Sequence, residues 1–208
     1  MIFRLDERPI FPNPKLAEPD GLLAIGGDLS VERLVNAYAD GIFPWYSYKE
    51  PILWYSPHKR FVLFPSQLKI SKSMRSVLRS GEFKITFNQN FEEVITACAS
   101  VPREGQKGTW ITDDMKKAYL ELHRLGKAHS IEVWKNDELA GGLYGVEVKQ
   151  VFCGESMFSK VSNASKTALI TLCQQKQYQL IDCQMYTEHL ESLGALMISR
   201  EEYQGFLI

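Results

Sequence analysis

The spacing of apolar residues predicts alternating helices and strands over most of the chain beyond residue 70. Apolar residues recur at helical intervals in five segments, which predicts helices over residues 71–80, 91–98, 112–125, 163–176 and 188–194. Alternating or unbroken apolar runs predict strands over residues 82–87, 129–134, 138–148, 150–158, 180–185 and 196–200. Short turns at Asn136-Asp137 and Lys149-Gln150 join three of these strands, so an antiparallel meander is expected.

The first sixty residues follow a different pattern. Prolines, glycines and large aromatic residues crowd stretches such as "EPDGLLAIGGDLS" and "GIFPWYSYKEPILWYSPHKR". Only one helix is predicted there, with Ser30 as its N-cap and Gly41 as its stop. The chain is therefore expected to divide into a small, turn-rich N-terminal domain over residues 1–62 and a larger domain over residues 63–208.

The order of elements in the larger domain indicates a fold class. Three hairpin-linked strands are followed by helix, strand, helix and strand, which is the layout of GNAT-like (acyl-CoA N-acyltransferase-like) proteins. The expected fold is α+β: a small turn-rich N-terminal domain plus a GNAT-like C-terminal domain whose mostly antiparallel sheet is flanked by helices.

Charge excludes one simple mode of partner binding. The chain has 24 Lys and Arg against 25 Asp and Glu, a formal net charge of -1, so the whole molecule does not attract nucleic acid. One stretch is strongly basic: Lys72, Arg75 and Arg79 are spaced to share one face of the helix over residues 71–80. That face is either an ordinary solvated surface or a site for phosphate contacts.

The sequence carries few signs of targeting, membrane or metal chemistry. The opening "MIFRLDERPIF" is not a secretory signal, and no run approaches the roughly 20 apolar residues of a membrane span, so a cytoplasmic protein without membrane association is expected. The four cysteines and four histidines lack metal-ligand spacing, and no metal site or disulfide is expected.

Two segments carry polar residues in an apolar setting. Asp182 and Gln184 alternate within "LIDCQM", which predicts that both point to one face of their strand. Glu155 lies within "FCGESMF", directly after Gly154. A carboxylate in such a place is either satisfied by nearby backbone donors or serves as a general base or binding group, and both interpretations stay open for Asp182 and Glu155.

Aromatic and sulfur-containing residues also admit two interpretations. Trp45 and Trp110 lie in turn-rich sequence, where they could pack a small domain or stack on nucleotide bases. Leu143, Phe152 and Met157 lie on adjoining strands, where they could form ordinary core or line a pocket for an apolar group.

Twelve segments in the same order carry a resemblance to a known family. They are "FPNP", "DGLLAIGGDLS", "AYADGIFPWY", "PILWYSPHKR", "SKSMR", "GTWIT", "AYLELHRLGKAHSIEVW", "LAGGLYGV", "FCGESMFS", "NASKTAL", "LIDCQ" and "HLESLGA". Together they cover most of the chain, and the sequence resembles the bacterial leucyl/phenylalanyl-tRNA protein transferases.

The resemblance implies an aminoacyltransferase (leucyltransferase type) without a metal or soluble cofactor. Members of this family move Leu or Phe, and Met less well, from aminoacyl-tRNA to the N-terminal Arg or Lys of a protein, which marks that protein for degradation. The implied partners are Leu-tRNA, Phe-tRNA and proteins with N-terminal Arg or Lys, and a monomer is expected.

The resemblance also implies site residues. By position, Trp45 and Trp110 match residues that hold the terminal adenosine of the tRNA, with Tyr38 and Tyr119 beside them. The matching catalytic set is Asp182, Gln184 and Glu155. The matching side-chain pocket is Leu143, Phe152, Met157, Leu169 and Ile181, and acceptor-stem phosphates are expected to meet Lys72, Arg75 and Arg79.

The expected reaction is aminolysis of an ester. An α-amino group attacks the carbonyl that joins the amino acid to the ribose, and Asp182 with Gln184 are the groups expected to help remove its proton. Two other functions are considered. An acetyl-CoA-dependent enzyme should show a pyrophosphate-binding R/Q-x-x-G-x-G/A motif, which "HRLGKA" matches poorly. A non-catalytic RNA-binding protein should not depend on Asp182.

Overall fold

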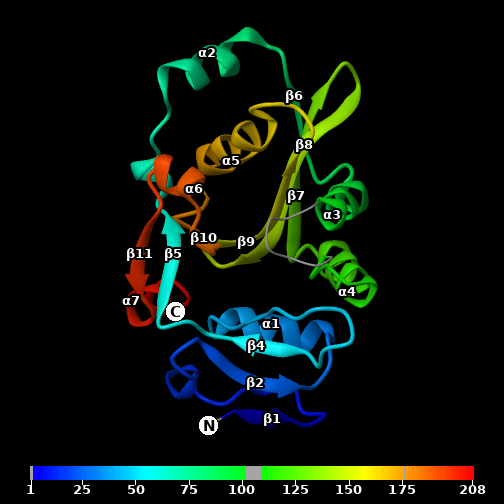
Figure 1. Ribbon diagram of the computed structural model, residues 1–208, viewed down its shortest axis with the longest axis vertical. Coiled ribbons are helices and arrows are strands. Elements are labelled where there is room, and N and C mark those ends of the chain that lie inside the picture. The colour runs from blue at the N-terminus through cyan, green and yellow to red at the C-terminus, as the bar shows by residue number, and fades with distance from the viewer. Residues whose placement is uncertain (1, 102–108, 176) are drawn as a thin grey trace.

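Two β-sheets of unequal size organise the chain. The computed structural model describes residues 2–101, 109–175 and 177–208. A four-stranded sheet has the order β1-β2-β4-β3, and a seven-stranded sheet has the order β11-β5-β10-β9-β8-β7-β6. Figure 1 shows the small sheet at one end of the molecule, below α1 and the large sheet. The fold is thus of the mixed α and β type that the sequence predicts.

The small sheet belongs to the N-terminal part of the chain. Its strands are β1 (Phe3–Leu5), β2 (Leu22–Gly26), β3 (Phe43–Pro44) and β4 (Leu53–Tyr55), with a 3-10 turn at Pro14–Leu16. Helix α1 (Val31–Ala39) begins at Ser30, whose hydroxyl accepts the N–H of Arg33. The chain then turns at Gly41 with φ of 73°, as predicted for this helix end. These strands span 2 to 5 residues each and lack a clear alternation, so the sequence did not reveal them.

The large sheet contains the predicted meander. Its strands are β5 (Lys59–Leu63), β6 (Lys84–Phe87), β7 (Ala128–Lys135), β8 (Glu138–Val148), β9 (Val151–Ser159), β10 (Leu180–Gln184) and β11 (Leu196–Ser199). Strands β7, β8 and β9 pair in sequence order and antiparallel, as expected. The turn between the first two has φ of 53° at Asn136 and 60° at Asp137. Within the described part of the large sheet, β9 and β10 are the one pair of strands that run parallel.

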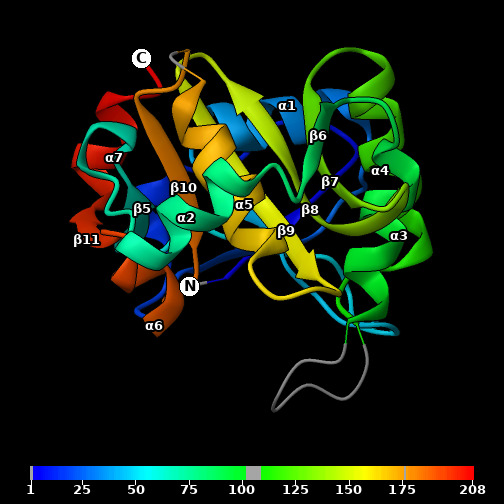
Figure 2. The same ribbon diagram turned by 90° about the horizontal axis from the view of Figure 1, so that it is seen from above.

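Helices cover both faces of the large sheet. They are α2 (Lys72–Ser80), α3 (Phe91–Ser100), α4 (Asp113–Arg124), α5 (Ala164–Gln174), α6 (Glu188–Ser192) and α7 (Arg200–Gly205), with a 3-10 turn at Pro65–Gln67. Figure 2 shows α5 on one face of the central strands, with α3 and α4 on the other. The predicted end of the fourth helix at Lys176 lies outside the described residues.

Local capping explains why several helix starts were predictable. The Ser71 hydroxyl accepts the N–H of Met74 at 3.1 Å, and the Thr112 hydroxyl accepts the N–H of Met115 at 3.2 Å. Each hydroxyl thereby satisfies one of the N–H groups that a helix leaves free in its first turn. No helix in the described part of the chain is long and apolar enough to cross a membrane.

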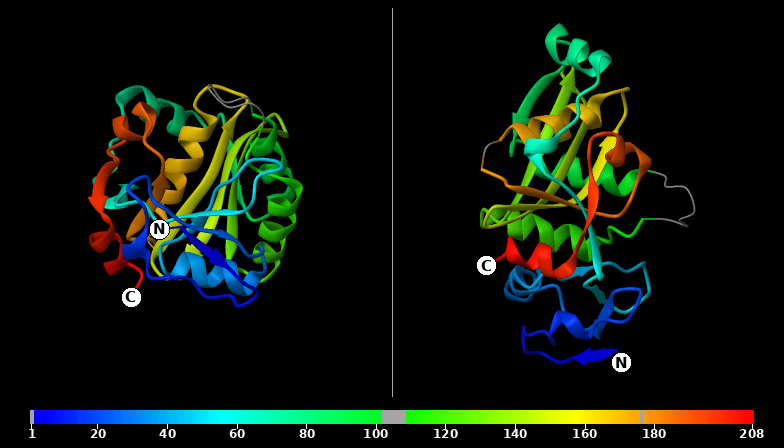
Figure 3. Two further views of the ribbon diagram at one scale, coloured as in Figure 1. Left: turned by 60° about the horizontal axis from the view of Figure 1, so that its bottom comes forward. Right: turned by 90° about the vertical axis from the view of Figure 1, so that its left-hand side faces the viewer.

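The C-terminal residues join the two parts of the chain. The expected strand over residues 196–200 ends at Ser199, because Ser199 caps a helix that the sequence analysis did not include. Arg200, the first residue of α7, is buried and donates to the carbonyl oxygens of Pro57 and Pro14. Figure 3 shows α7 close to the small unit. The division after residue 62 stays a prediction; strand β5, which begins at Lys59, pairs within the large sheet.

Candidate active site

Two β-bulges lie side by side where the parallel pairing of β9 and β10 ends. The parallel register stops at the pair Cys153 and Asp182. On β9 the pairing with β8 then shifts, so that Glu155 is an extra residue between Gly154 and Ser156. On β10 the pairing with β5 also shifts beyond Asp182, and Gln184 has φ of 58°. Bulges redirect side chains near functional sites, and here they turn Glu155 and Gln184 toward each other.

A glycine makes the first bulge possible. A Cβ atom on Gly145 would lie 2.3 Å from the carbonyl oxygen of Cys153 and 2.5 Å from the Phe152 ring. Both distances are far shorter than van der Waals contact. Only glycine therefore allows β8 and β9 to approach each other at the point where Glu155 leaves the regular ladder.

Glu155 is a buried carboxylate held by three polar side chains. One of its oxygens accepts the Gln184 side-chain N–H at 2.7 Å, and the other accepts the Tyr119 hydroxyl at 3.0 Å. The Tyr119 hydroxyl in turn lies 2.5 Å from that of Tyr38. Burial raises the pKa of Glu155 to about 7, although these hydrogen bonds oppose the shift. A carboxyl group with this pKa can take up and release a proton near neutral pH.

Asp182 has a different environment. Its side chain is fully buried and forms an ion pair with Arg60, while its other oxygen accepts the backbone N–H of Gln184 at 2.9 Å. The Arg60 guanidinium lies against the rings of Phe43 and Tyr203, at 4.9 and 4.3 Å from their centroids. It also donates to the carbonyl of Gly41 at 3.1 Å.

The simple alternation predicted for Asp182 and Gln184 is wrong. The bulge inserts Cys183 as an extra residue, so the two side chains take different partners. The Asp182 carboxylate bonds to Arg60, whereas the Gln184 amide bonds to Glu155. The link between Asp182 and Gln184 runs through the backbone N–H of Gln184.

An apolar cavity of about 150 Å³ opens beside Glu155. The five residues predicted for a side-chain pocket all line it: Leu143, Phe152, Met157, Leu169 and Ile181. Leu172, Met185 and Leu190 add apolar side chains to its wall, and Asp182 and Thr187 are among its polar lining residues. Apolar cavities of about 150 Å³ hold a benzene-sized group, so the space suits one leucyl or phenyl side chain.

The four aromatic residues assigned to adenosine binding differ in accessibility. Tyr38 and Tyr119 are 2% and 0% exposed. Their hydroxyls are hydrogen-bonded to each other, and that of Tyr119 donates to Glu155. Trp110 is 9% exposed. Trp45 is half-buried, directly after β3, with its ring in edge contact with Tyr55 at 5.9 Å. Trp45 thus presents the most open aromatic surface of the four.

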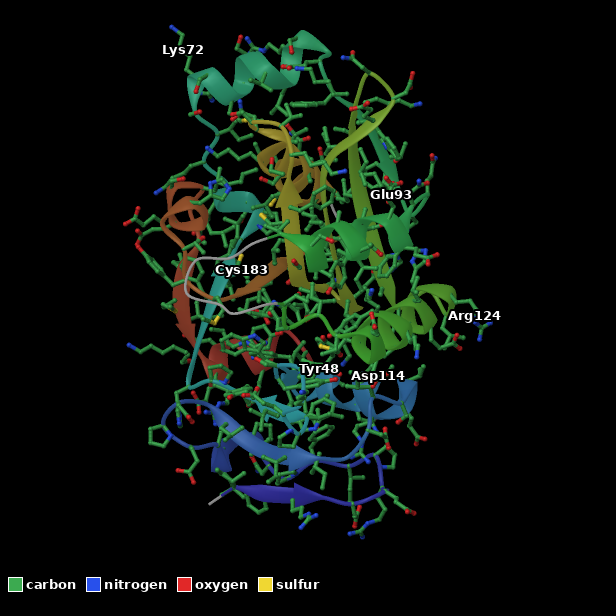
Figure 4. All side chains as sticks on the ribbon, turned by 45° about the vertical axis from the view of Figure 1, so that its right-hand side comes forward. Tyr48, Lys72, Glu93, Asp114, Arg124 and Cys183 are labelled. Carbon is green, nitrogen blue, oxygen red and sulfur yellow. The ribbon has the colours of Figure 1, made fainter. Side chains whose placement is uncertain are left out.

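The three basic residues lie on exposed positions of α2. Lys72, Arg75 and Arg79 all face solvent around the buried Met74. Figure 4 shows Lys72 at the end of the molecule remote from the small sheet, whereas Cys183, at the cavity, lies midway. This exposure is compatible with both phosphate binding and a solvated helix face.

Sequence analysis missed the residues that support the site from a distance. Arg60 and Tyr203 lie 122 residues before and 21 residues after Asp182. Arg60 ends the shared motif "PILWYSPHKR", but no local pattern marks either residue as a neighbour of Asp182. Their role depends on contacts across the fold. Among the described residues, no group of three or more His, Cys, Asp or Glu side chains is placed to hold a metal ion.

The fold and site together define a class. In this mixed α and β protein, a buried carboxylate with a pKa near 7 lies beside an apolar cavity. This combination is typical of an enzyme that binds an apolar group and transfers a proton. Family models refine this class. The leucyl/phenylalanyl-tRNA protein transferase model matches residues 62–208, and the model of its N-terminal domain matches residues 27–58.

Curated relatives agree over nearly the full length. The chain is 58% identical to a leucyl/phenylalanyl-tRNA–protein transferase of Flavobacterium psychrophilum, over 95% of both chains. It is 53% identical to that of Hydrogenovibrio crunogenus over 99% of this chain and 82% of the relative. This chain belongs to the leucyl/phenylalanyl-tRNA protein transferase family, as its sequence motifs indicate.

Solved structures offer only remote similarity. One functionally unknown protein from Staphylococcus epidermidis has a TM-score of 0.49 at 8% identity, over 68% of this chain and 57% of that chain. An aminoglycoside acetyltransferase from an uncultured soil sample has a TM-score of 0.39 at 11% identity, over 60% of this chain and 87% of that chain. These values are too low to support an argument about function.

Proposed function

We propose that this chain transfers Leu or Phe, and Met less well, from aminoacyl-tRNA to the N-terminal Arg or Lys of acceptor proteins. The new N-terminal residue would then act as a degradation signal. One observation carries the proposal within the family: Glu155, a proton-transfer group, lies at an apolar cavity of about 150 Å³. Because charged tRNA is the donor, we expect the reaction in the bacterial cytoplasm, with the enzyme as a monomer.

We also propose that the chain consists of two domains. The large sheet, with its meander β7-β8-β9 and the parallel partner β10, supports a GNAT-like C-terminal domain. The N-terminal unit with the four-stranded sheet supports a separate small domain. We place their junction within residues 56–58, between β4 and β5, because β5 pairs with β10 and β11 of the large sheet.

The cavity would bind the side chain of the amino acid being transferred. Its lining is apolar, and the flexible Met157 and Met185 can adapt to a branched or an aromatic group. Burying such a side chain contributes about 1.5–3 kcal/mol, which is enough to select apolar from polar aminoacyl groups. The ester carbonyl would then lie near the cavity mouth, close to Glu155.

The chemistry is an exchange of a C–O bond for a C–N bond. The neutral α-amine of the acceptor attacks the ester carbonyl, the ribose oxygen leaves, and an amide forms. One proton must leave the nitrogen and one must reach the ribose oxygen. Glu155 is placed to accept the first and, with its pKa near 7, to return it to the leaving oxygen. The ester supplies its own activation, so the step needs no metal or soluble cofactor.

Gln184 and Asp182 would act in support of Glu155. The Gln184 amide holds one oxygen of Glu155, and Asp182 holds the backbone of Gln184 in its bulged conformation. The ion pair with Arg60 occupies the other Asp182 oxygen. We therefore assign proton transfer to Glu155, and positioning to Asp182, in place of the direct role expected from the sequence.

The tRNA would contact two separate regions. Trp45 would offer the terminal adenosine its half-buried ring as a stacking surface, and the more buried Trp110 would offer a smaller one. Tyr38 and Tyr119 are too deeply buried to stack on the adenosine. We propose instead that their hydroxyls position Glu155. The basic residues Lys72, Arg75 and Arg79 would meet the phosphates of the acceptor stem.

Transfer can be measured directly. We expect radiolabelled Leu to move from Leu-tRNA to a peptide that begins with Arg, and not to the same peptide beginning with Glu. Glu155→Gln should lower the rate by about one to three orders of magnitude, the usual contribution of a general base. A rate for Glu155→Gln equal to that of the wild type would remove Glu155 from the mechanism. Transfer from acetyl-CoA instead of Leu-tRNA would support the acetyltransferase alternative.

A further inference from the structure

Exposed apolar side chains gather at one edge of the large sheet, beside the cavity. The described chain has eleven large apolar side chains that are exposed, and four of them are Met185, Tyr186, Leu196 and Met197. The other seven belong to other segments of the chain. Single exposed apolar residues need no explanation, but a contiguous group of them commonly marks a binding surface.

Sheet pairing and a ring contact place Met197 and Tyr186 on one surface, on either side of Phe61. Met197 on β11 is the register partner of Phe61 on β5, and the Tyr186 ring lies 5.2 Å from the Phe61 ring. Phe61 itself is buried, so it forms a floor between Met197 and Tyr186. Leu196 is paired with Val62 and points to the opposite face of the sheet, so we call Met185, Tyr186 and Met197 the edge surface.

The edge surface is continuous with the site. Met185 lines the apolar cavity and is also 54% exposed, so it stands at the cavity mouth. It directly follows Gln184, whose side chain holds Glu155. An acceptor peptide whose N-terminal nitrogen lies at Glu155 would therefore leave the site across Met185 and Tyr186.

The sheet edge adds backbone groups to this surface. Strand β11 is the end of the sheet order and pairs only with β5 among the described strands. Figure 3 shows β11 in front of β5, with no further strand drawn beyond it. Such an edge leaves backbone N–H and C=O groups that can pair with an extended peptide whatever its side chains.

Charge indicates what kind of peptide would bind. Helix α6 carries Glu188 and Glu191 on exposed positions of its first turn, and the Tyr186 hydroxyl donates to Glu191 at 2.8 Å. An aromatic face next to a carboxylate is suited to a guanidinium or an ammonium group. The edge surface thus combines a cation site with a sequence-independent strand edge.

We propose that the edge surface binds the acceptor protein, with its basic N-terminal side chain against the Tyr186 ring and the Glu191 carboxylate and its following residues along β11. This inference rests on the proposed transfer to N-terminal Arg or Lys. It explains how one enzyme would demand a basic first residue and yet accept many different sequences after it.

The test separates acceptor binding from the rest of the reaction. Initial rates with Leu-tRNA would be measured against the concentration of an eight-residue peptide that begins with Arg. Glu191→Gln and Tyr186→Ala should each raise the KM for the peptide about fivefold to tenfold, since exposed charge and cation–π contacts are modest. Neither variant should change the KM for Leu-tRNA. Met197→Asp, which places a charge at the edge, should raise the peptide KM but leave that of a two-residue peptide unchanged.

Control variants and the activity of the wild type distinguish failure of the proposed acceptor site from failure of the proposed function. Glu92→Gln and Phe87→Ser remove an exposed acid and an exposed apolar residue far from the site, and neither should alter the peptide KM. If the wild type transfers Leu but all three edge variants keep its peptide KM, the edge surface is not the acceptor site while the proposed function stands. If the wild type transfers nothing to the peptide, both proposals fail. A wild-type dimer that Met197→Asp dissociates without a change in peptide KM would assign the edge to a second copy of the chain.

Discussion

Arg60 and Asp182 form an ion pair closed off from solvent, with side chains that are 2% and 0% exposed. The pair connects three regions of the chain. Arg60 also reaches Gly41 and Phe43 at the start of the segment that bears Trp45, while Asp182 holds the backbone of Gln184. The proposed nucleoside surface and the proposed proton-transfer group are thus fixed to one buried pair of charges.

The first prediction concerns the stability of this pair. Arg60→Met leaves the Asp182 charge buried without its partner, so the free energy of unfolding should fall by about 3–5 kcal/mol. The double variant Arg60→Met, Asp182→Leu removes both charges and should recover much of this loss. Urea unfolding of the purified variants measures both values. Stability of Arg60→Met within about 1 kcal/mol of the wild type would show that the pair is not closed to water.

The double variant Arg60→Met, Asp182→Leu also tests whether Asp182 positions Gln184. Without Asp182, the backbone N–H of Gln184 loses its acceptor, and the bulge that directs Gln184 to Glu155 should relax. We expect a stable protein with a lower kcat for transfer and a nearly unchanged KM for Leu-tRNA. Full activity in the double variant would mean that Asp182 contributes to folding alone.

The second prediction is a dependence of rate on pH. Burial raises the pKa of Glu155 to about 7, and only the deprotonated carboxylate can accept a proton. The kcat/KM for Leu-tRNA, which reports the free enzyme, should therefore rise with pH through about 7 and level off above it. Tyr119→Phe removes a hydrogen bond that lowers this pKa, so the midpoint should move to higher pH. A midpoint that stays in place would separate Tyr119 from the titrating group.

The same shift predicts a dependence of stability on pH. Because the folded-state pKa of Glu155 is raised above the usual 4.5, its protonated form stabilises the fold, and this contribution is complete below pH 4.5. It is lost as the pH rises to about 7, by up to roughly 3 kcal/mol. Glu155→Gln should accordingly gain stability relative to the wild type between pH 5 and pH 8 in urea unfolding. Parallel curves for the two proteins would contradict the raised pKa.

The third prediction concerns the choice of amino acid. Met157 lines the cavity, so Met157→Ala should enlarge it and either favour bulkier side chains or weaken all of them by roughly 1–3 kcal/mol in kcat/KM. Competition among Leu-, Phe- and Met-tRNA would measure the change. Ala168→Ser on the same helix as Leu169 lies in the core but not in the cavity wall, and serves as a control for general damage. Unchanged rates in stable Met157→Ala would make Met157 an ordinary core residue.

The fourth prediction separates the two proposed tRNA contacts. Trp45→Ala should weaken both full-length Leu-tRNA and a minimal leucyl-adenosine by about 1–3 kcal/mol, because both carry the base that stacks. The triple variant Lys72→Ala, Arg75→Ala, Arg79→Ala should weaken only the tRNA and reduce the steepness of its salt dependence. Michaelis constants at several salt concentrations give both results. An unaltered salt slope would identify the basic residues of α2 as a solvated helix face.

Local chemistry in the sequence determined much of the framework. Ser30, Ser71 and Thr112 each cap a helix at its predicted start, because a cap needs only a hydroxyl and an N–H two or three residues away. The turn at Asn136-Asp137 is equally local, and it sets the register of the meander. The motifs shared with the family predicted that five residues would line one pocket, and in the structure all five line the same cavity.

Tertiary structure decided where the polar groups point. The sequence indicates that Asp182 and Gln184 alternate, but a bulge intervenes, because β10 must pair with β5 and β9 while Gln184 reaches Glu155. Partners of buried charges are chosen by proximity in the fold, as Arg60 shows for Asp182 across 122 residues. Desolvation likewise depends on the folded surroundings of a group: burial raises the pKa of Glu155, and the hydrogen bonds from Tyr38, Tyr119 and Gln184 offset that rise only in part. Sequence patterns encode local conformation and apolar faces, whereas long-range packing sets the environment in which the carboxylates act.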